Sequence, residues 1–255
     1  MRFLAVGDLV GSGGLKKLTD TLQNLQESEH IDFTIVNGEN CSDGMGLTTK
    51  DYNQLKKLNI DVITMGNHTW GKRDIFSFID ESNIIRPANY SEGLCGKGYM
   101  IVEKLGKKVC VINLIGRTDM GVLSDNPFTC IDKIINNLKD QVDYFVVDFH
   151  AEATAEKIAM RYYLDGRVSM LFGTHTHVQT ADEQILEKGT GYITDLGMTG
   201  PKNSVIGMNI DSSLKRFTTS IPERYRVAEG PCILNGIIFD VDENGRTTKI
   251  YRIDL

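Results

Sequence analysis

The pattern of apolar and polar positions along the first 90 residues predicts strands and helices in alternation. Short apolar runs typical of buried strands cover 2–7, 32–37 and 61–65. The first run is followed by apolar residues at helical spacings of three and four, at Leu15, Leu18, Leu22 and Leu25. Helices are predicted over 15–25, from Thr48 or Thr49 to Leu58 and over 72–80, before a short extended piece at 84–87. This alternation indicates parallel β–α–β units.

The pattern changes at Tyr99. Two runs, 99–105 and 108–115, flank the short turn Gly106-Lys107 and predict an antiparallel hairpin. Farther along we expect helices over 130–138 and 153–164, strands ending at His150 and His175, and strands near 191–195, 232–241 and 246–253. Two mixed sheets packed together with helices outside account for this order. The sequence therefore predicts an α/β fold, a four-layer α/β/β/α sandwich, in one domain spanning 1–255.

The segment 198–230 fits neither pattern, because it is rich in Gly, Ser, Thr, Asn and Pro and has little periodicity. Connections of this length are usually functional loops or lids. We expect this segment to overhang a site at the preceding strands. A surface excursion or a contact between copies in a homo-oligomer is the open alternative.

Five predicted strands end in side chains that bind metal ions or protons. These side chains are Asp8, Glu39, Asn40, Asn67, His68, His150, His175 and His177. In α/β proteins the carboxyl ends of strands form the usual site edge. Carboxylate, imidazole and carboxamide groups together suit iron, manganese or zinc, and a buried group of so many ionisable side chains is costly without a cation. The sequence therefore predicts a metal site at this edge.

Two parts of this set need separate interpretation. On an extended segment His175 and His177 face the same way, although two surface histidines in a loop would look identical. His68 is either a structural hydrogen-bonding residue or, beside the probable ligand Asn67, a proton donor, since imidazole titrates near neutral pH.

Composition narrows the functional classes. The chain has 255 residues and a net charge of −6, which argues against nonspecific nucleic-acid binding through a basic surface. The five cysteines are scattered and never in Cys-x-x-Cys spacing, which disfavours structural zinc and disulfides and favours reduced thiols. With no secretory signal and no apolar stretch of 18 residues, we expect a cytoplasmic protein without a membrane span.

Two further features invite a nucleotide interpretation. The glycine-rich turn 7–14 lacks the third glycine of Gly-x-Gly-x-x-Gly, so we expect its glycines to let the backbone pass close to the metals. Trp70, the only tryptophan, could stack on a base, but we expect it to pack against the neighbouring helix.

The strand-end blocks carry a family resemblance. Gly7-Asp8, Gly38-Glu39-Asn40, Gly66-Asn67-His68, His150 and Gly173-Thr-His175-Thr-His177 resemble, in order, the blocks of the calcineurin-like metallophosphoesterases. The amino-acid sequence of segments 7–11, 37–41, 64–70 and 173–180 is more closely similar to that of the bacterial YmdB-like phosphodiesterase branch. The resemblance covers essentially the whole chain. Val10 stands where the superfamily usually has histidine, and Glu39 where it usually has aspartate; the YmdB-like branch shares both changes, with Asn40 resembling a substitute ligand.

The resemblance implies a dinuclear metal centre and a reaction. One metal ion would be held by Asp8, Glu39, Asn40 and His177, and the second by Glu39, Asn67, His150 and His175. The implied metal is iron, with manganese as the alternative and zinc less favoured. The implied substrates are small phosphodiesters such as 2′,3′-cyclic nucleoside monophosphates, attacked by a hydroxide that bridges the metals, with His68 protonating the departing alkoxide.

Three other functions stay open. A metal-dependent amidohydrolase in a TIM barrel also uses His-x-His, but there the pair usually follows the first strand. A phosphomonoesterase or protein phosphatase would use the same fold and ligands. A regulatory protein that senses a nucleotide without turnover is a different class, and it has no need of His68 beside the metals.

Overall fold

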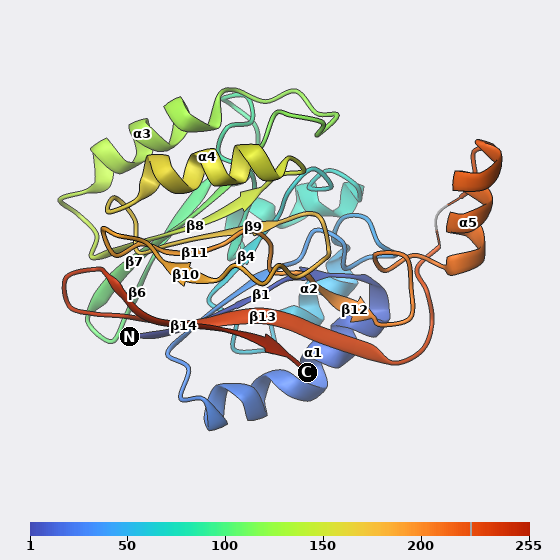
Figure 1. Cartoon of the computed structure of the whole chain (residues 1–255), viewed down its shortest axis with the longest axis horizontal. Coiled ribbons are helices and arrows are strands. Elements are labelled where there is room, and N and C mark those ends of the chain that lie inside the picture. Colours follow the sequence, from blue (N-terminus) through green and yellow to red (C-terminus); the bar gives the residue numbers. More distant parts are fainter. Residues whose placement is uncertain (225) are drawn as a thin grey trace.

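The computed structural model describes residues 1–224 and 226–255, which form two mixed sheets packed face to face (Figure 1). The first sheet has the strand order β2-β12-β13-β1-β3-β4-β5, with β14 added beside β13. Its strands are β1 (Arg2–Val6), β2 (Asp8–Leu9), β3 (Phe33–Asn37), β4 (Val62–Thr64), β5 (Ile84–Ile85), β12 (Met198–Pro201), β13 (Cys232–Val241) and β14 (Thr247–Asp254).

The second sheet has the order β10-β11-β9-β8-β7-β6. Its strands are β6 (Tyr99–Lys104), β7 (Lys107–Ile115), β8 (Tyr144–His150), β9 (Met170–Thr174), β10 (Gln184–Ile185) and β11 (Gly191–Ile193). The described helices are α1 (Gly11–Ser28), α2 (Thr49–Leu55), α3 (Pro127–Leu138), α4 (Thr154–Leu164) and α5 (Ile210–Thr219), with 3₁₀ turns η1 (Arg73–Ser77) and η2 (Ile79–Glu81).

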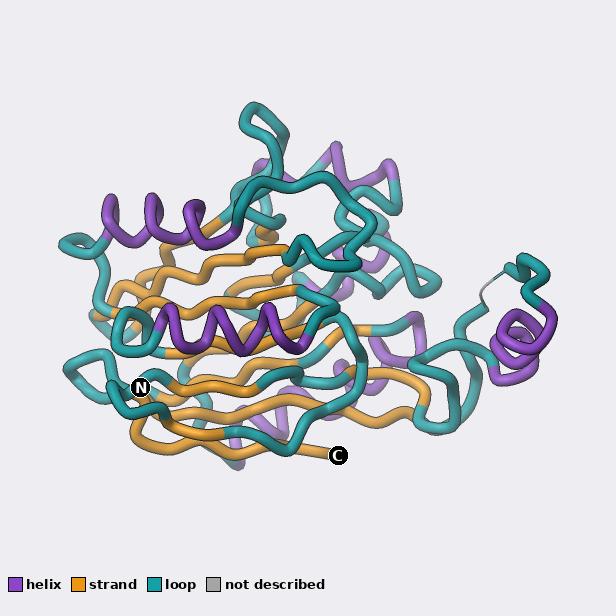
Figure 2. The backbone as a smooth tube through the Cα atoms, turned by 45° about the horizontal axis from the view of Figure 1, so that its top comes forward, coloured by secondary structure: helices purple, strands orange, loops and turns teal. Residues whose placement is uncertain are grey.

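Alternation along the strands builds the layers. In β1, Phe3 lies in the core between the two sheets, whereas Leu4 belongs to the core shared with α1 and α2. In β8, Tyr144 lies between the sheets and Phe145 packs toward α3 and α4. Helices therefore cover both outer faces (Figure 2), and the predicted four-layer sandwich is confirmed. Two open sheets also exclude the TIM barrel.

Several element predictions need correction. Helix α1 begins at Gly11 rather than at 15, because Gly11 and Gly14 allow close packing: a Cβ on Gly14 would lie 2.2 Å from the Thr199 carbonyl oxygen. The segment 72–80 forms the two 3₁₀ turns instead of one α-helix. Strands β10 and β12 and helix α5 were not predicted. None of them has an apolar face buried on one side along its length.

The segment 198–230 begins as β12, which pairs with both β2 and β13 inside the first sheet. It then leaves the body, and α5 stands apart from the two sheets (Figures 1 and 2). Among the described helices, none has both the length and the apolar character needed to cross a membrane.

Candidate metal centre

The eight side chains singled out in the sequence lie at the ends of five strands. By strand they are Asp8 after β1, Glu39 and Asn40 after β3, Asn67 and His68 after β4, His150 at the end of β8, and His175 and His177 after β9. Because β1, β3 and β4 are parallel, as are β8 and β9, their carboxyl ends meet at one edge. The structure brings all eight side chains into one connected group.

One half of the group centres on Glu39 and His150. The His150 Nε2 lies 3.1 Å from Glu39 Oε1, 2.8 Å from Asn67 Oδ1 and 3.0 Å from His175 Nδ1. One donor atom from each of Glu39, His150 and His175 falls within 4.8 Å of the others. Carboxylate and imidazole atoms facing one another this closely form a donor set that fits a divalent cation.

The other half centres on Asp8 and His177. The Asp8 Oδ1 lies 3.7 Å from His177 Nε2, and Asn40 Nδ2 lies 3.1 Å from the same His177 nitrogen. The Asn40 amide also donates to Asp8 Oδ1 at 3.5 Å and to Glu39 Oε1 at 3.2 Å. In this orientation its nitrogen faces the anions, so Asn40 must rotate its amide to offer Oδ1 to a metal.

His68 lies at the partly exposed rim of this group of side chains. Its backbone N–H donates to Glu39 Oε2 at 2.9 Å, and its Nδ1 lies 2.7 Å from Asn40 Oδ1. With the amide oxygen facing it, Nδ1 carries a proton; once the amide rotates to offer Oδ1 to a metal, Nδ2 faces Nδ1 instead and the ring proton of neutral His68 lies on Nε2. The His68 side chain is 31% exposed, against 1% for Glu39, so it is the member of this pair that can meet a substrate.

The other three histidines each have their second ring nitrogen held by an oxygen acceptor. Nδ1 of His150 faces Thr174 Oγ1 at 2.9 Å, and that hydroxyl donates to Asp148. Nε2 of His175 lies 3.1 Å from Glu152 Oε2, and Nδ1 of His177 lies 2.8 Å from the carbonyl oxygen of Ile206. These contacts fix the tautomers and leave one lone pair of each ring for the shared group.

The expectation that His175 and His177 lie on an extended segment is wrong. Strand β9 ends at Thr174, and the two histidines have φ values of 101° and 64°, in the left-handed region that non-glycine residues rarely adopt. Two carboxylates hold this strained turn: Asp8 accepts from the backbone N–H of His175, and Asp195 from that of Thr176, both at 3.1 Å. Both imidazoles reach the group through this turn rather than through strand alternation.

A buried ion pair behind this turn was missed by sequence reasoning. The Lys157 Nζ lies 2.7 Å from Asp195 Oδ2 and donates to the Thr174 carbonyl oxygen at 2.9 Å. Both side chains of the pair are at most 2% exposed. The available signal was a lysine in the apolar stripe of α4, together with Met160 and Leu164.

The expected role of the glycines also needs correction. In the turn after β1, a Cβ on Gly7 would lie 2.2 Å from the Gly197 carbonyl oxygen, so that glycine allows approach to the chain before β12. The glycine pressed against the group is Gly66, where a Cβ would lie 2.4 Å from His150 Nε2. Trp70 stacks on Phe76 at 5.2 Å and on Tyr90 at 6.4 Å, which confirms packing as its role.

Burial and mutual charge shift the pKa values of the group. Burial raises the pKa of Asp8. Burial also opposes ionisation of Glu39, but the charge and hydrogen bond of His150 outweigh it and lower the Glu39 pKa to about 2. For His150, burial is outweighed by Glu39 and Asp8, which raise its pKa to about 9. Burial and the His150 charge lower the pKa of His175 to about 3. The carboxylates thus favour a cation at this position, either a proton or a metal.

Comparisons with known proteins agree with the fold and identify the family. The model of the YmdB-like protein family matches residues 4–253. A 2′,3′-cyclic-nucleotide 2′-phosphodiesterase from Bacillus subtilis (strain 168) is 49% identical over 255 residues, covering 99% of this chain and 96% of the relative.

Solved structures share the fold of this chain. The crystal structure of a novel phosphatase from Mycoplasma pneumoniae has a TM-score of 0.94 and 38% identity, covering 100% of this chain and 93% of that one. A 5′-nucleotidase from Candida albicans shares the fold alone, with a TM-score of 0.58, 16% identity and coverage of 99% and 50%. The chain therefore belongs to the YmdB-like protein family of phosphoester hydrolases.

Proposed function

We propose that the enzyme is a metal-dependent phosphodiesterase acting on small phosphodiesters, with 2′,3′-cyclic nucleoside monophosphates as the substrate class. The observation that carries the proposal is the cluster of Glu39, His150 and His175 donor atoms within 4.8 Å, with the partly exposed His68 bonded to its edge. The 49% identical relative with this activity supports the substrate class.

The ligand assignment follows the two halves of the group. Asp8, Glu39, Asn40 and His177 would hold one ion, and Glu39, Asn67, His150 and His175 the other, with Glu39 shared. The ions would supply positive charge against the reacting phosphate and lower the pKa of water. We propose iron as the metal, with manganese as the alternative and zinc less favoured, following the family resemblance; the imidazole nitrogens and the carboxylate and carboxamide oxygens suit all three.

The chain's own residues orient the metal-binding imidazole rings and supply a proton to the leaving group. The imidazole rings of His150, His175 and His177 are held in place by Thr174, Glu152 and the Ile206 carbonyl oxygen, respectively. The Lys157–Asp195 pair fixes the backbone of Thr174 and Thr176 on either side of His175. His68 is positioned by its backbone bond to Glu39 to give a proton to the departing alkoxide, a poor leaving group that benefits from a general acid.

Two alternatives have specific consequences. A phosphomonoesterase activity is favoured by the similarity to the Mycoplasma pneumoniae phosphatase. A nucleotide-sensing protein without turnover would leave His68 without a role in chemistry. An assay of the metal-loaded enzyme on 2′,3′-cyclic nucleotides, a generic diester and a generic monoester separates these functions. A preference for diesters in kcat/KM supports the proposal, and a preference for monoesters or no hydrolysis at all contradicts it.

Location and assembly complete the proposal. The five cysteines are free thiols, which is compatible with the reducing cytosol, and we propose the cytoplasm as the compartment. Self-association stays a prediction, supported by Leu214 and Phe217, which are 53% and 73% exposed on the projecting α5. The covering role of 198–230 also stays a prediction, supported by the contact of Ile206 with His177.

A further inference from the structure

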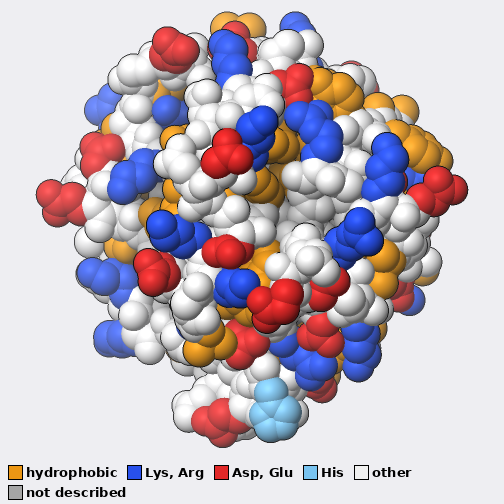
Figure 3. Space-filling model, turned by 90° about the vertical axis from the view of Figure 1, so that its left-hand side faces the viewer, with side chains coloured by type: hydrophobic (Ala, Val, Ile, Leu, Met, Phe, Trp, Pro, Cys, Tyr) orange, Lys and Arg blue, Asp and Glu red, His pale blue; other side chains and the backbone are white. Residues whose placement is uncertain are grey.

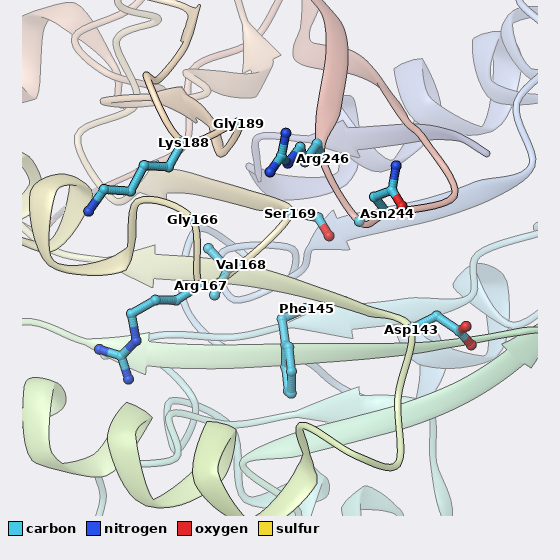
Figure 4. A pocket seen from close by; sticks show the side chains of 11 residues that line it. Asp143, Phe145, Gly166, Arg167, Val168, Ser169, Lys188, Gly189, Asn244 and Arg246 are labelled. Atoms are coloured by element: carbon cyan, nitrogen blue, oxygen red, sulfur yellow. The ribbon is translucent and has the colours of Figure 1, made fainter.

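A second pocket lies at the opposite edge of the sheets from the metal centre. It has a volume of about 460 Å³ and is lined by residues just before β8 and β9 and by the loops before β11 and β14 (Figure 4). His150 stands at the carboxyl end of β8 and Asp143 just before its amino end, so the length of a seven-residue strand, about 20 Å, separates the two sites.

Positive charge on the pocket wall is not fully neutralised. Its cationic side chains are Arg167, Lys188 and Arg246, and the one acidic lining residue is Asp143. Arg167 pairs with Asp132 at 2.6 Å, and the Asp143 carboxylate accepts from the backbone N–H of Lys108 at 2.7 Å.

Lys188 and Arg246 are different from Arg167. Within residues 1–224 and 226–255, neither the Lys188 ammonium nor the Arg246 guanidinium has an ion pair or hydrogen bond. Two positive charges therefore face this part of the surface without an ion pair or hydrogen bond, although the Arg246 charge attracts the Asp242 carboxylate and lowers the pKa of that group.

Glycines with positive φ hold the stems of these two cations against the wall. A Cβ on Gly166 (φ 78°) would lie 2.7 Å from Lys188 Cβ, and a Cβ on Gly189 (φ 95°) would lie 2.9 Å from Arg246 Cγ. Each long side chain thus packs closely over a backbone that has no side chain of its own. This packing restricts where the two charged ends can go, which lowers the entropy lost when they bind an anion.

The hydroxyl of Ser169, which opens into the pocket, completes the wall. Ser169 is 2% exposed, yet its Oγ has no hydrogen-bond partner among the described residues, while its backbone groups are both paired. It lines the pocket near Gly245, whose added Cβ would lie 3.7 Å from this oxygen (Figure 4). Although the residue as a whole is buried, this oxygen is not among the buried polar atoms without a partner, so it is reached from the pocket and can bond to a ligand atom or water.

We propose that this pocket binds a small molecule bearing a phosphate group. A phosphomonoester carries about −1.5 to −2 charges near neutral pH, which matches the two unpaired cations. Its oxygens accept from ammonium and guanidinium groups and from a hydroxyl, the donors that this wall supplies. The volume is large enough for a mononucleotide as well as for inorganic phosphate. Both charge signs are mixed over the rest of this end of the molecule (Figure 3), so the attraction is local to the pocket.

Equilibrium dialysis of the metal-loaded protein with labelled inorganic phosphate, and separately with a mononucleotide, tests the proposal. Wild type should bind one ligand at the metal centre and one at the pocket. The variant Lys188→Ala/Arg246→Ala should lose the second binding event by about tenfold or more in affinity, because two charged hydrogen-bond donors are removed. Hydrolysis of diesters should be unchanged, since neither residue touches the metal centre.

The matched control is Lys57→Ala/Lys249→Ala, which removes two positive charges from exposed positions outside the pocket. It should bind both ligands as wild type does. Loss with phosphate and nucleotide alike identifies a phosphate site, and loss with the nucleotide alone identifies a site that also needs the nucleoside. Wild-type isotherms for Lys188→Ala/Arg246→Ala with both probes would overturn the proposal.

Discussion

The two edges of the sheets use ionisable groups in opposite ways. At the carboxyl edge, Asp8, Glu39 and His150 are completely buried; Glu39 contacts His150, and Asp8 accepts from the Asn40 amide. At the amino edge, Lys188 and Arg246 are exposed, and their charged ends have no ion pair or hydrogen bond among the described residues. Buried anions and imidazoles without a compensating charge favour a metal cation, whereas surface cations held over glycines favour a phosphate anion. The charge of the side chains therefore decides which kind of ligand each edge accepts, and burial decides how costly it is to leave that charge uncompensated.

The largest effect is expected from removing the shared anion at the buried edge. Glu39→Gln keeps the size of the side chain but removes the charge that both proposed ions use. We expect kcat to fall by about 10³-fold or more, together with loss of bound metal measured by elemental analysis. Full metal content with wild-type turnover would remove Glu39 from the centre.

His68→Ala separates proton transfer from metal binding. The variant should retain both metal ions and lose about 10²–10⁴-fold in kcat, the usual contribution of a general acid. Elemental analysis and steady-state kinetics on one preparation measure both properties. If the metals are lost instead, His68 is a ligand rather than a proton donor.

Lys157→Met tests the buried support of the histidine turn. It leaves Asp195 as an unpaired buried anion, and breaking a buried pair in this way costs about 3–5 kcal/mol of unfolding free energy. Urea unfolding measures the loss. Lys56→Met, on the exposed surface of the other half of the molecule, is the control and should change stability by less than about 0.5 kcal/mol. Equal stability of both variants would contradict the assigned role.

Glu152→Ala should have a smaller effect, because Glu152 is half exposed. Without this carboxylate, His175 loses the acceptor that fixes its tautomer, and metal affinity should fall by about tenfold. Competition with a coloured chelator measures the affinity. A wild-type affinity would show that the Glu152 contact does not orient the ring.

The smallest expected effect is the pH dependence of the thermal stability of the metal-stripped protein. The raised pKa of His150 gives stability that is fully present below 6.5 and is lost as pH rises through about 9. The lowered pKa of Glu39 gives stability that is fully present above 4.5 and is lost as pH falls through about 2. The Tm difference between chelator-treated wild type and Glu39→Gln should therefore be largest between pH 4.5 and 6.5 and smaller at pH 9.5. A difference that grows toward pH 9.5 would contradict this assignment.

The strand ends were readable from the sequence because each apolar run stops abruptly at a polar ligand, and parallel strands bring such ends together. The strain at His175 was not readable, since positive φ at a histidine is imposed by Asp8 and Asp195 from distant parts of the chain. The amino-edge pocket could not be predicted from the sequence for the same reason, because distant parts of the chain form it. Lys188 and Arg246 look like ordinary surface cations until the fold sets both beside Ser169.

Anomalous X-ray diffraction from crystals of the metal-loaded enzyme tests the central claim most directly. We predict two anomalous peaks about 3.5–4 Å apart, with Glu39 between them, Asp8, Asn40 and His177 around one, and Asn67, His150 and His175 around the other. A single peak, or peaks away from these side chains, would contradict the assignment of a dinuclear centre.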